Sequence, residues 1–529
     1  MRLTRRSFLG ACAATGAGYC LGGTPASAAT SSGKRQYNLS ISIEALEKEP
    51  ERLKVFADAG GTHVWVPGFF YGHWPVPLDQ VCAWRKRALD MGLDAQMINI
   101  PLGHPGDALG SSSGAFPLTG PKHWHNGQRP DGKLYSGTSL HEPATEENVA
   151  ALKEIAKCGV SRVFVDDDFR LAPSPGQIGG CFCDEHKADF LKKGSYAESA
   201  WAELIDCVNR RELSPILRAW VEYTCDQLTG CFRAMQAATS TVEMGNMVMY
   251  FGAEKAGIRL TDYRGVPLRV GEMMFHDGDF GTVKGKTDEL YSCLFHRRFV
   301  TPELAYSETT AYPSDKLSAA NMAAKLAVST IADVRNTMFM SGLTAFPMAH
   351  WDVLGPAMKH HATLHERLAG HTPKGPFKHY WGEASRYVGD DKPFSLCLAS
   401  GVPFEVVDAP PETGWVFLSD ADAKQAATQK LPEKTRWVSR IAGPQGPGAR
   451  VMDESLDAMF ALKHELADEL KEVPHVAEDK PAVCAWYPTA NAALLWNLSE
   501  TREKLTLRMG TVDRTVEIGA LGADIVDLA

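Results

Sequence analysis

Short apolar runs alternate with loops and longer helical patterns from Tyr37 to about Pro347. Each run is typical of a buried strand, and the stretches between them, such as 315–336, repeat apolar residues at helical spacing. Several helical stretches end in the glycine that is expected just after a helix C-terminus. The apolar runs lie at 38–44, 62–68, 94–100, 162–168, 246–252, 268–275, 304–310 and 342–348.

Eight strands, each followed by a helix, predict a closed (β/α)8 TIM barrel of the α/β class. A doubly wound open sheet is the alternative, but it needs a glycine-rich phosphate-binding turn after an early strand, which the sequence lacks. We therefore place a catalytic barrel at 36–372.

Two smaller domains are predicted after the barrel, because the pattern changes after about residue 376. Short strands and helices at 373–475 indicate a small α/β domain of the flavodoxin-like kind, and this domain is a candidate for oligomerisation. From 476 to 529 apolar and polar residues alternate, with turns between the runs. This pattern indicates a C-terminal antiparallel β domain, similar to a β-sandwich.

The first residues, MRLTRRSFLG, carry the pair Arg5-Arg6, and a weakly apolar Ala/Gly stretch then leads to the small residues at 26–28. This arrangement is typical of a twin-arginine export signal, here 1–29, and a buried first helix is the alternative. We therefore expect a bacterial protein that is exported folded, to the periplasm or out of the cell.

The 529 residues carry a net charge of −9, and removal of the signal, with its three arginines and no acid, makes it about −12. So acidic a chain is poorly suited to nucleic acid. After the signal, no apolar run approaches the roughly 18 residues of a membrane span. The ten cysteines outside the signal are scattered, so we expect most of them to be buried thiols.

Candidate chemistry lies at the C-terminal ends of the strands, where barrels of this kind have their active sites. The fourth run ends in the three aspartates 166–168, and the seventh contains Glu308. Adjacent carboxylates repel one another and are costly to desolvate unless they are paired or used. Glycoside cleavage needs two facing acids, one to protonate the leaving oxygen and one to attack the sugar. Asp168 and Glu308 are our candidates for this pair.

We expect other polar and aromatic side chains near the same strand ends to position the substrate. The alternative for each is a structural role, such as a helix cap, a loop charge or packing. A mouth of acids and aromatic rings suits a neutral glycan better than an anion. The candidates for substrate binding are Asp166, Asp167, Arg170, Glu272, His276 and Trp351, and further rings are Trp65, Phe69, Phe70, Tyr71, Trp74, Trp124 and Tyr312.

Cys181, Cys183 and His186 form a Cys-x-Cys-x-x-His cluster in the loop after the fourth run. Two thiolates and an imidazole at close spacing suit a tetrahedral zinc with a structural role. The alternative is that these side chains never bind a metal. The fourth ligand is left open among Asp184, His104, His123, His125 and His141.

The stretches VDDDF at 165–169 and CFCDEH at 181–186 resemble the β-galactosidases of glycoside hydrolase family 42. In that family Asp-Asn-Glu-Tyr ends the fourth barrel strand, and a Cys-x-Cys-x-x-Cys zinc cluster follows. The resemblance implies that Asp168 stands in place of the glutamate acid/base, Asp167 in place of the asparagine and His186 in place of the third cysteine. It also implies that Glu308 is the nucleophile and that the small α/β domain is used for trimerisation.

The sequence departs from the family at the acid, because aspartate is one methylene shorter than glutamate and moves the oxygens by about 1 Å. We therefore expect a distant relative: an exported glycosidase, β-galactosidase-like, that cleaves an oligo- or polysaccharide by a two-carboxylate, retaining mechanism without a catalytic cofactor. Inversion is the alternative, if the two carboxyls lie roughly 6.5–9.5 Å apart instead of about 5–5.5 Å. It is expected to form a homo-oligomer, a trimer or dimer. The alternatives are a non-catalytic carbohydrate-binding protein and a metal-dependent barrel isomerase or lyase.

Overall fold

The computed structural model of the protein describes residues 34–102, 120–166, 169–172, 174, 176–271, 274–342, 344–429, 432–445 and 448–528. The predicted export signal, 1–29, lies outside these residues.

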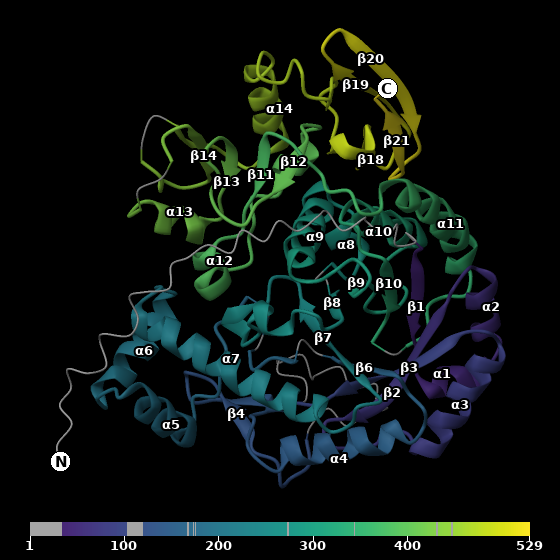
Figure 1. Ribbon diagram of the computed structural model, residues 1–529, viewed down its shortest axis with the longest axis vertical. Coiled ribbons are helices and arrows are strands. Elements are labelled where there is room, and N and C mark those ends of the chain that lie inside the picture. Colours follow the sequence, from purple (N-terminus) through teal and green to yellow (C-terminus); the bar gives the residue numbers. More distant parts are fainter. Residues whose placement is uncertain are drawn as a thin grey trace, which may run out of the picture.

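Among the described residues, eight parallel strands close into a barrel, with β1 paired to both β2 and β10 (Figure 1). This confirms the predicted (β/α)8 barrel. The barrel strands, in the order of the chain, are β1 (Gln36–Ser40), β2 (His63–Phe70), β3 (Asp94–Ile100), β6 (Arg162–Val165), β7 (Glu243–Met249), β8 (Leu268–Gly271), β9 (Ala305–Thr310) and β10 (Asn336–Met340).

The eighth strand is β10, and the prediction that placed it at 342–348 was wrong. The preceding helix, α10 (Ala319–Ile331), ends earlier than the helical pattern at 315–336 suggested. Asp333 then takes a left-handed conformation, with φ 51°, and turns the chain so that Asn336 begins the strand. Of the apolar run at 342–348, the described residues, 342 and 344–348, therefore follow the strand instead of forming it.

Helices surround the barrel, and several begin at a side-chain cap. Ser318 caps α10 and Thr282 caps α9, each accepting a backbone N–H of the first turn. The helices of the barrel region are α1 (Ile43–Lys48), α2 (Arg52–Asp58), α3 (Leu78–Asp90), α4 (Ala144–Ala156), α7 (Pro215–Gln236), α8 (Asp277–Phe280), α9 (Val283–His296), α10 and α11 (His350–Leu368), with 3-10 turns η3 (Glu254–Ala256), η4 (Leu260–Tyr263) and η5 (Arg297–Phe299).

Two insertions into the barrel were not predicted. A hairpin, β4 (Asn126–Gln128) and β5 (Leu134–Thr138), follows the third barrel strand. Two extra helices, α5 (Asp184–Gly194) and α6 (Ser199–Arg210), precede α7 after the fourth strand. Phe190 and Leu204 of these helices share a hydrophobic cluster with Trp220 of α7.

The small α/β domain is a five-stranded parallel sheet in the order β12-β11-β13-β14-β15. Numbered along the chain this order is 2-1-3-4-5, which is that of a flavodoxin-like sheet, as predicted. The elements are β11 (Phe377–His379), α12 (Glu383–Val388), η6 (Leu396–Ala399), β12 (Phe404–Val406), β13 (Gly414–Phe417), α13 (Asp420–Ala426), β14 (Thr435–Ser439), β15 (Ala449–Val451) and α14 (Leu456–Glu465).

The C-terminal domain consists of two antiparallel three-stranded sheets, β16-β19-β20 and β17-β18-β21. Cys484, Leu495, Leu505 and Ile518 come from both sheets and share one core. The predicted antiparallel β domain is confirmed. Its elements are β16 (His475–Val476), β17 (Ala482–Tyr487), η7 (Pro488–Ala490), β18 (Ala492–Asn497), β19 (Glu503–Met509), β20 (Val512–Ile518) and β21 (Ala523–Asp527).

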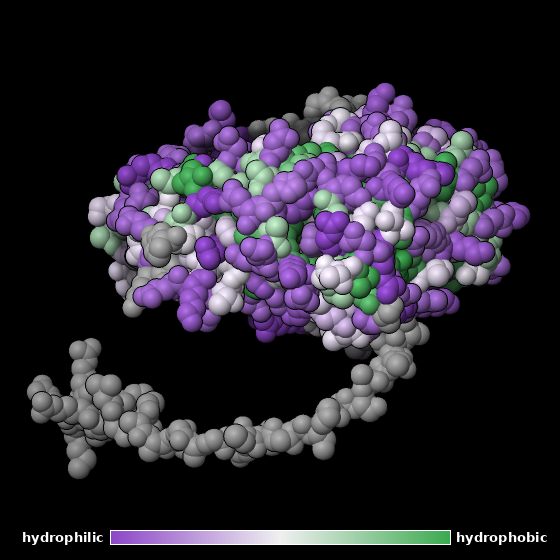
Figure 2. Space-filling model, turned by 90° about the horizontal axis from the view of Figure 1, so that it is seen from above, coloured by the Kyte–Doolittle hydropathy of each residue, from purple (hydrophilic) through white to green (hydrophobic). Residues whose placement is uncertain are grey.

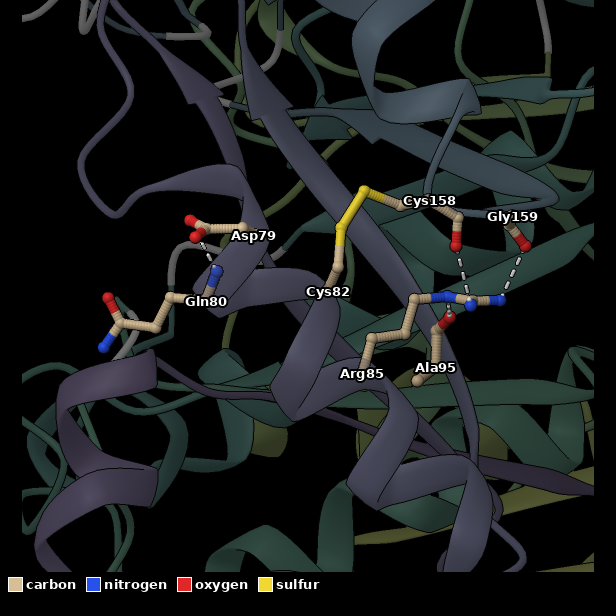
Figure 3. Close-up of a disulfide and its surroundings, with 7 residues drawn as sticks. All are labelled: Asp79, Gln80, Cys82, Arg85, Ala95, Cys158 and Gly159. Atoms are coloured by element: carbon tan, nitrogen blue, oxygen red, sulfur yellow. Dashed lines mark hydrogen bonds between the residues drawn. A yellow bond between two sulfur atoms is a disulfide. The ribbon is translucent and has the colours of Figure 1, made fainter.

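A disulfide joins Cys82 of α3 to Cys158, just after α4, with the two Cα atoms 5.8 Å apart (Figure 3). Beside it, the Arg85 guanidinium donates hydrogen bonds to the carbonyls of Ala95, Cys158 and Gly159. The scatter of cysteines did not reveal this pair. The expectation of buried thiols holds for the other cysteines of the described residues, because seven of the eight free ones are buried and only Cys183 is half-exposed.

Hydrophilic residues predominate on the face drawn in Figure 2, and the hydrophobic ones on it are scattered. In the part of the chain that the structure describes, no helix combines the length and the apolar character needed to cross a bilayer.

Candidate functional site

The Glu308 carboxylate lies inside the barrel, near the C-terminal end of β9. Side chains alternate between the two faces of a strand, so Glu308 shares its face with Tyr306, two residues earlier. The Tyr306 ring packs with Trp65, Phe164 and Met338 in the cluster that fills the barrel interior. Glu308 therefore lies above this packed layer, and it is 4% exposed.

Arg269, on β8, joins Glu308 to the first aspartate of the predicted acidic run. Its Nε lies 2.8 Å from Oε2 of Glu308, and its Nη2 forms an ion pair with Oδ1 of Asp166. The guanidinium is fully buried. One arginine from the sixth strand thus holds acids from the fourth and seventh. Sequence reasoning missed it, although an arginine within the apolar run LRVG is a recognisable signal.

A hydroxyl also holds the Glu308 carboxylate, and a glycine lies beside it. The Thr310 hydroxyl donates to Oε1 of Glu308 across 2.6 Å. At Gly271, the last residue of β8, an added Cβ would lie 3.4 Å from Oε2 of Glu308 and only 2.4 Å from Cε of Met247. A larger residue at this position would therefore displace the end of Met247, whereas the Glu308 carboxylate lies at an ordinary contact distance.

Asp166 is the only member of the acidic run that falls within the described residues, and it is buried. Its backbone N–H donates to the carbonyl of Asn99 on the neighbouring strand. The predicted acid/base Asp168, the neighbouring Asp167 and the predicted substrate ligand Glu272 lie outside the described residues.

The structure places the other predicted substrate ligands in different surroundings. Arg170 follows Asp166 closely in the sequence. Its side chain is buried, and its Nε donates a hydrogen bond to the carbonyl of Ala172. His276 is half-exposed, and its Nε2 lies 3.1 Å from Oδ2 of Asp279. Trp351 packs edge-on against Phe residues of the hydrophobic core, namely Phe56, Phe339 and Phe346. Its assignment to the substrate is therefore not retained: with the eighth strand at 336–340, Trp351 belongs to the first turn of α11.

Of the other rings that we considered for sugar stacking, Trp74 and Tyr312 are well exposed, at 36% and 47%. Trp74 follows β2 and Tyr312 follows β9, so both lie on the C-terminal side of the barrel. The remaining rings, Trp65, Phe69, Phe70, Tyr71 and Trp124, are buried.

Backbone strain is present at the same end of the barrel. Tyr71, Phe169 and Tyr250 follow the second, fourth and fifth barrel strands, and all three have left-handed φ angles between 47° and 52°. Bulky residues rarely adopt this conformation, and such residues cluster at active sites and ligand clamps. The strain supports a functional site at the C-terminal end of the barrel.

The predicted metal cluster is brought together, with His141 as its fourth member. The donor atoms of His141, Cys181, Cys183 and His186 all lie within 4.8 Å of one another. Sγ of Cys183 is 3.4 Å from Nε2 of His141 and 3.2 Å from Nδ1 of His186. A tetrahedral zinc with bonds of about 2.0–2.3 Å separates its ligands by roughly 3.3–3.8 Å, so the donor set fits zinc.

Nδ1 of His141 lies 3.1 Å from Oε2 of Glu185. Metal-bound histidines usually donate their second ring N–H to a carboxylate, which orients the ring, so this contact suits a ligand. Without a cation, burial raises the pKa of the Cys181 thiol to about 11 and lowers the pKa of His186 to about 4. Both groups are then neutral, and a bound dication would favour the thiolate.

No protein-family model matches this sequence, and no curated protein is similar to it in sequence. A solved β-galactosidase structure is similar to this chain in fold. The β-galactosidase of Rahnella sp. R3 superposes with a TM-score of 0.59 at 12% identity, over 93% of this chain and 98% of the galactosidase. A GH27 β-L-arabinopyranosidase from Geobacillus stearothermophilus gives a TM-score of 0.41 at 8% identity, over 94% and 96% of the two chains.

The match to the galactosidase covers almost the whole of both chains, so this chain has the same fold along nearly its full length. The architecture implied by the sequence resemblance is thereby confirmed. At 12% identity the likeness concerns the fold alone.

Proposed function

We propose that this protein is an exported glycoside hydrolase that cleaves a glycan by a retaining, two-carboxylate mechanism. The observation that carries the proposal is Glu308, an acid inside the barrel near the end of the seventh strand, whose two oxygens are held by Arg269 and Thr310. An acidic run at the end of the fourth strand provides the partner. The fold, which is that of a β-galactosidase, is consistent with this chemistry.

In this mechanism the Asp168 carboxylic acid protonates the glycosidic oxygen while a Glu308 oxygen attacks the anomeric carbon. The bond to the leaving group breaks, and a glycosyl ester forms on Glu308. Asp168, now ionised, then takes a proton from water, and the resulting hydroxide displaces Glu308 from the sugar. Atoms balance without a cofactor, because water supplies both the hydroxyl and the proton.

The substrate in this proposal is a neutral oligo- or polysaccharide. Trp74 and Tyr312 are exposed rings on the C-terminal side of the barrel, where they are suited to stack on the apolar faces of sugars. A β-galactoside is the first substrate to test, given the resemblance of the motif at 165–186. The small α/β domain would supply the contacts of a homo-oligomer.

Export is supported by two independent features. The twin-arginine pattern precedes the barrel, and the Cys82–Cys158 disulfide requires an oxidising compartment to persist. We propose that the protein acts in the periplasm or outside the cell.

We also propose that Cys181, Cys183, His186 and His141 bind a structural zinc. These side chains come from the hairpin region and from the start of α5, so a metal would fasten the loop after the fourth strand to the preceding loop. The zinc would stabilise the fold and take no part in the cleavage.

Replacement of the two acids tests the main proposal. We expect Glu308→Gln and Asp168→Asn each to reduce hydrolysis of an activated aryl glycoside at least 1,000-fold, because each removes one half of the mechanism. Glu44→Gln is the matched control: this acid also follows a barrel strand, but it is 58% exposed and paired with Lys48. Activity within a few-fold of the unsubstituted protein in either active-site variant removes that residue from the mechanism.

One observation favours a second candidate, a carbohydrate-binding protein without turnover. Glu308 is almost fully buried and already paired with Arg269, which suits a structural acid as well as a nucleophile. Glycan binding without hydrolysis across a broad panel of aryl glycosides supports this candidate. A metal-dependent isomerase or lyase instead predicts activity that a chelator abolishes and magnesium or manganese restores. Within the described residues the one candidate metal group includes neither Asp166 nor His276.

A further inference from the structure

Arg269 is fully buried and touches both acids at the barrel mouth, yet the two-carboxylate mechanism gives it no role. Its Nε contacts Glu308 and its Nη2 contacts Asp166. Since the guanidinium has no exposed surface, it can influence a substrate only through these carboxylates.

The position of Arg269 is fixed by packing. Its guanidinium carbon lies 5.3 Å from the ring centroid of Phe164, and its Nη1 lies 3.3 Å from Sδ of Met338. Phe164, Arg269 and Met338 come from the fourth, sixth and eighth barrel strands, and side chains of alternate strands form the layers of such barrels. In the register of β8 and β9, Arg269 pairs with Tyr306, two residues before Glu308. The guanidinium therefore belongs to the rigid layer directly beneath the acids.

We propose that Arg269 is a positioning residue, which fixes the direction and the negative charge of the Glu308 carboxylate for attack on the sugar, and that Asp166 acts through Arg269. This inference rests on the proposed glycoside hydrolysis and adds a residue to it. The guanidinium is planar and rigid, so the pull of Asp166 on Nη2 also sets the position of Nε and of the positive charge beside Glu308. Without the cation, the two buried carboxylates would lose the positive charge that now contacts both of them.

Asp166 thereby takes a different role from the substrate contact that its sequence position suggested. Its carboxylate is buried and engaged by the arginine. It orients the guanidinium, and the guanidinium orients the nucleophile.

The test compares Arg269→Lys, Arg269→Met and Asp166→Asn, with kcat and KM for an aryl glycoside measured across pH and with thermal unfolding measured for each variant. Lysine keeps the positive charge and loses the fork, whereas methionine keeps the length and loses the charge. The matched control is Arg35→Lys. Arg35 is also a buried barrel arginine, but it lies before β1, at the opposite end of the strands, where it donates to Thr330 and Thr337.

We expect Arg269→Met to lower kcat about 100-fold with KM within a few-fold, because a misplaced nucleophile affects the transition state more than binding. The pH profile of kcat/KM is expected to change as well, since the variant removes the positive charge that contacts the two carboxylates. Arg269→Lys should restore part of kcat, and Asp166→Asn should produce a smaller change in the same direction. The effects of Asp166→Asn and Arg269→Met should not add in the double variant. Arg35→Lys should lower the unfolding temperature and leave the pH profile unchanged.

The inference is overturned if folded Arg269→Lys and Asp166→Asn have the pH profile and kcat of the unsubstituted protein. If Arg269→Met does not fold, these two variants decide the question. Should the unsubstituted protein hydrolyse no glycoside, the proposed function fails and the inference fails with it. Loss of activity in Glu308→Gln together with normal Arg269 variants leaves the function standing and rejects the inference alone.

Discussion

Arg269, Lys255 and Lys325 are cations inside the protein, and each faces a carboxylate. Lys255 pairs with Asp391, and Lys325 lies 3.3 Å from the buried Glu289. Burial raises the pKa of Glu289 to about 7, although Lys325 opposes the shift. Removing one partner of such a buried pair typically costs about 3–5 kcal/mol, because the other charge is left in a poorly solvated place.

At the scale of single residues, the sequence indicated the acidic side chains of the site better than the cations that pair with them. Because Glu308 lies near the end of an apolar run, we predicted that it would lie at the barrel mouth. The structure places it near the C-terminal end of β9, as that prediction requires. Nothing in the sequence related Arg269 to Asp166 or Glu308, because those contacts cross three strands that are far apart in the chain. The assignment of His141 among the open candidates for the fourth metal ligand likewise needed coordinates.

The metal ligands give a prediction at the scale of single residues. We expect Cys183→Ser, or prolonged treatment with a strong chelator, to remove about one zinc per chain and to lower the unfolding temperature, since a structural zinc contributes to folding free energy. The metal content of the purified protein and its thermal unfolding curve measure both effects. Cys207→Ser is the control, because Cys207 is a free buried cysteine outside the metal group. A protein purified without zinc, whose stability is insensitive to chelators, would contradict the assignment.

The elements follow the apolar pattern where propensity and packing agree. The strands at 94–100 and 305–310 match the predicted runs closely. Helix α10 packs between the barrel and α11, so most of its residues are buried. The apolar pattern of the helix therefore continues into β10 without a polar break, and for this reason the predicted eighth strand was misplaced. The end of that helix is set by the turn at Asp333, which no spacing of apolar residues indicates.

At the scale of helices and strands, we predict that the Cys82–Cys158 disulfide stabilises the fold. It links α3 to the end of α4 across 76 residues, and closing a loop of that length in the unfolded chain stabilises the fold by about 4 kcal/mol in the chain-entropy model. We expect the double variant Cys82→Ala/Cys158→Ala to unfold at a lower temperature than the unsubstituted protein.

Reduction serves as the internal control for this comparison. A reducing agent should lower the unfolding temperature of the unsubstituted protein and leave that of the double variant unchanged. Equal sensitivity of both proteins would contradict a stabilising disulfide. Detection of free thiols at Cys82 and Cys158 in protein recovered from the periplasm would argue against the proposed compartment.

The barrel and the small α/β domain meet through buried polar contacts. Glu254 and Lys255, which follow the fifth barrel strand, pair with Arg386 and Asp391 of the small domain. His379 of β11 lies against α9, where its Nε2 is 2.7 Å from the carbonyl of Tyr291. These contacts tie the small domain to the barrel.

Acid should weaken this interface. Burial, together with nearby cations such as Arg298, lowers the pKa of His379 to about 3 and that of His296, on α9, to about 4. In the unfolded chain these histidines titrate near pH 6.5, so between that pH and 4 the unfolded state binds more protons. Stability therefore falls as the pH falls, by about 2 kcal/mol per histidine between pH 6.5 and 5.

We expect His379→Gln to flatten the dependence of the unfolding temperature on pH between 7 and 5. His464→Gln is the control, because the His464 side chain is 63% exposed and pairs with Asp479 at the surface. Parallel curves for His379→Gln and the unsubstituted protein would show that the interface histidine does not carry the acid sensitivity.

The sequence by itself determined the class of fold, the order of the three domains and the acidic end of the fourth strand. Periodicity and turn residues are local signals, and they are repeated along the whole chain. Only the tertiary structure decided which charges meet: Arg269 with Asp166 and Glu308, His141 with the two cysteines and His186, and Cys82 with Cys158. Each of these contacts joins residues from different elements of the chain, and tertiary packing, rather than any local pattern, sets the distance between them.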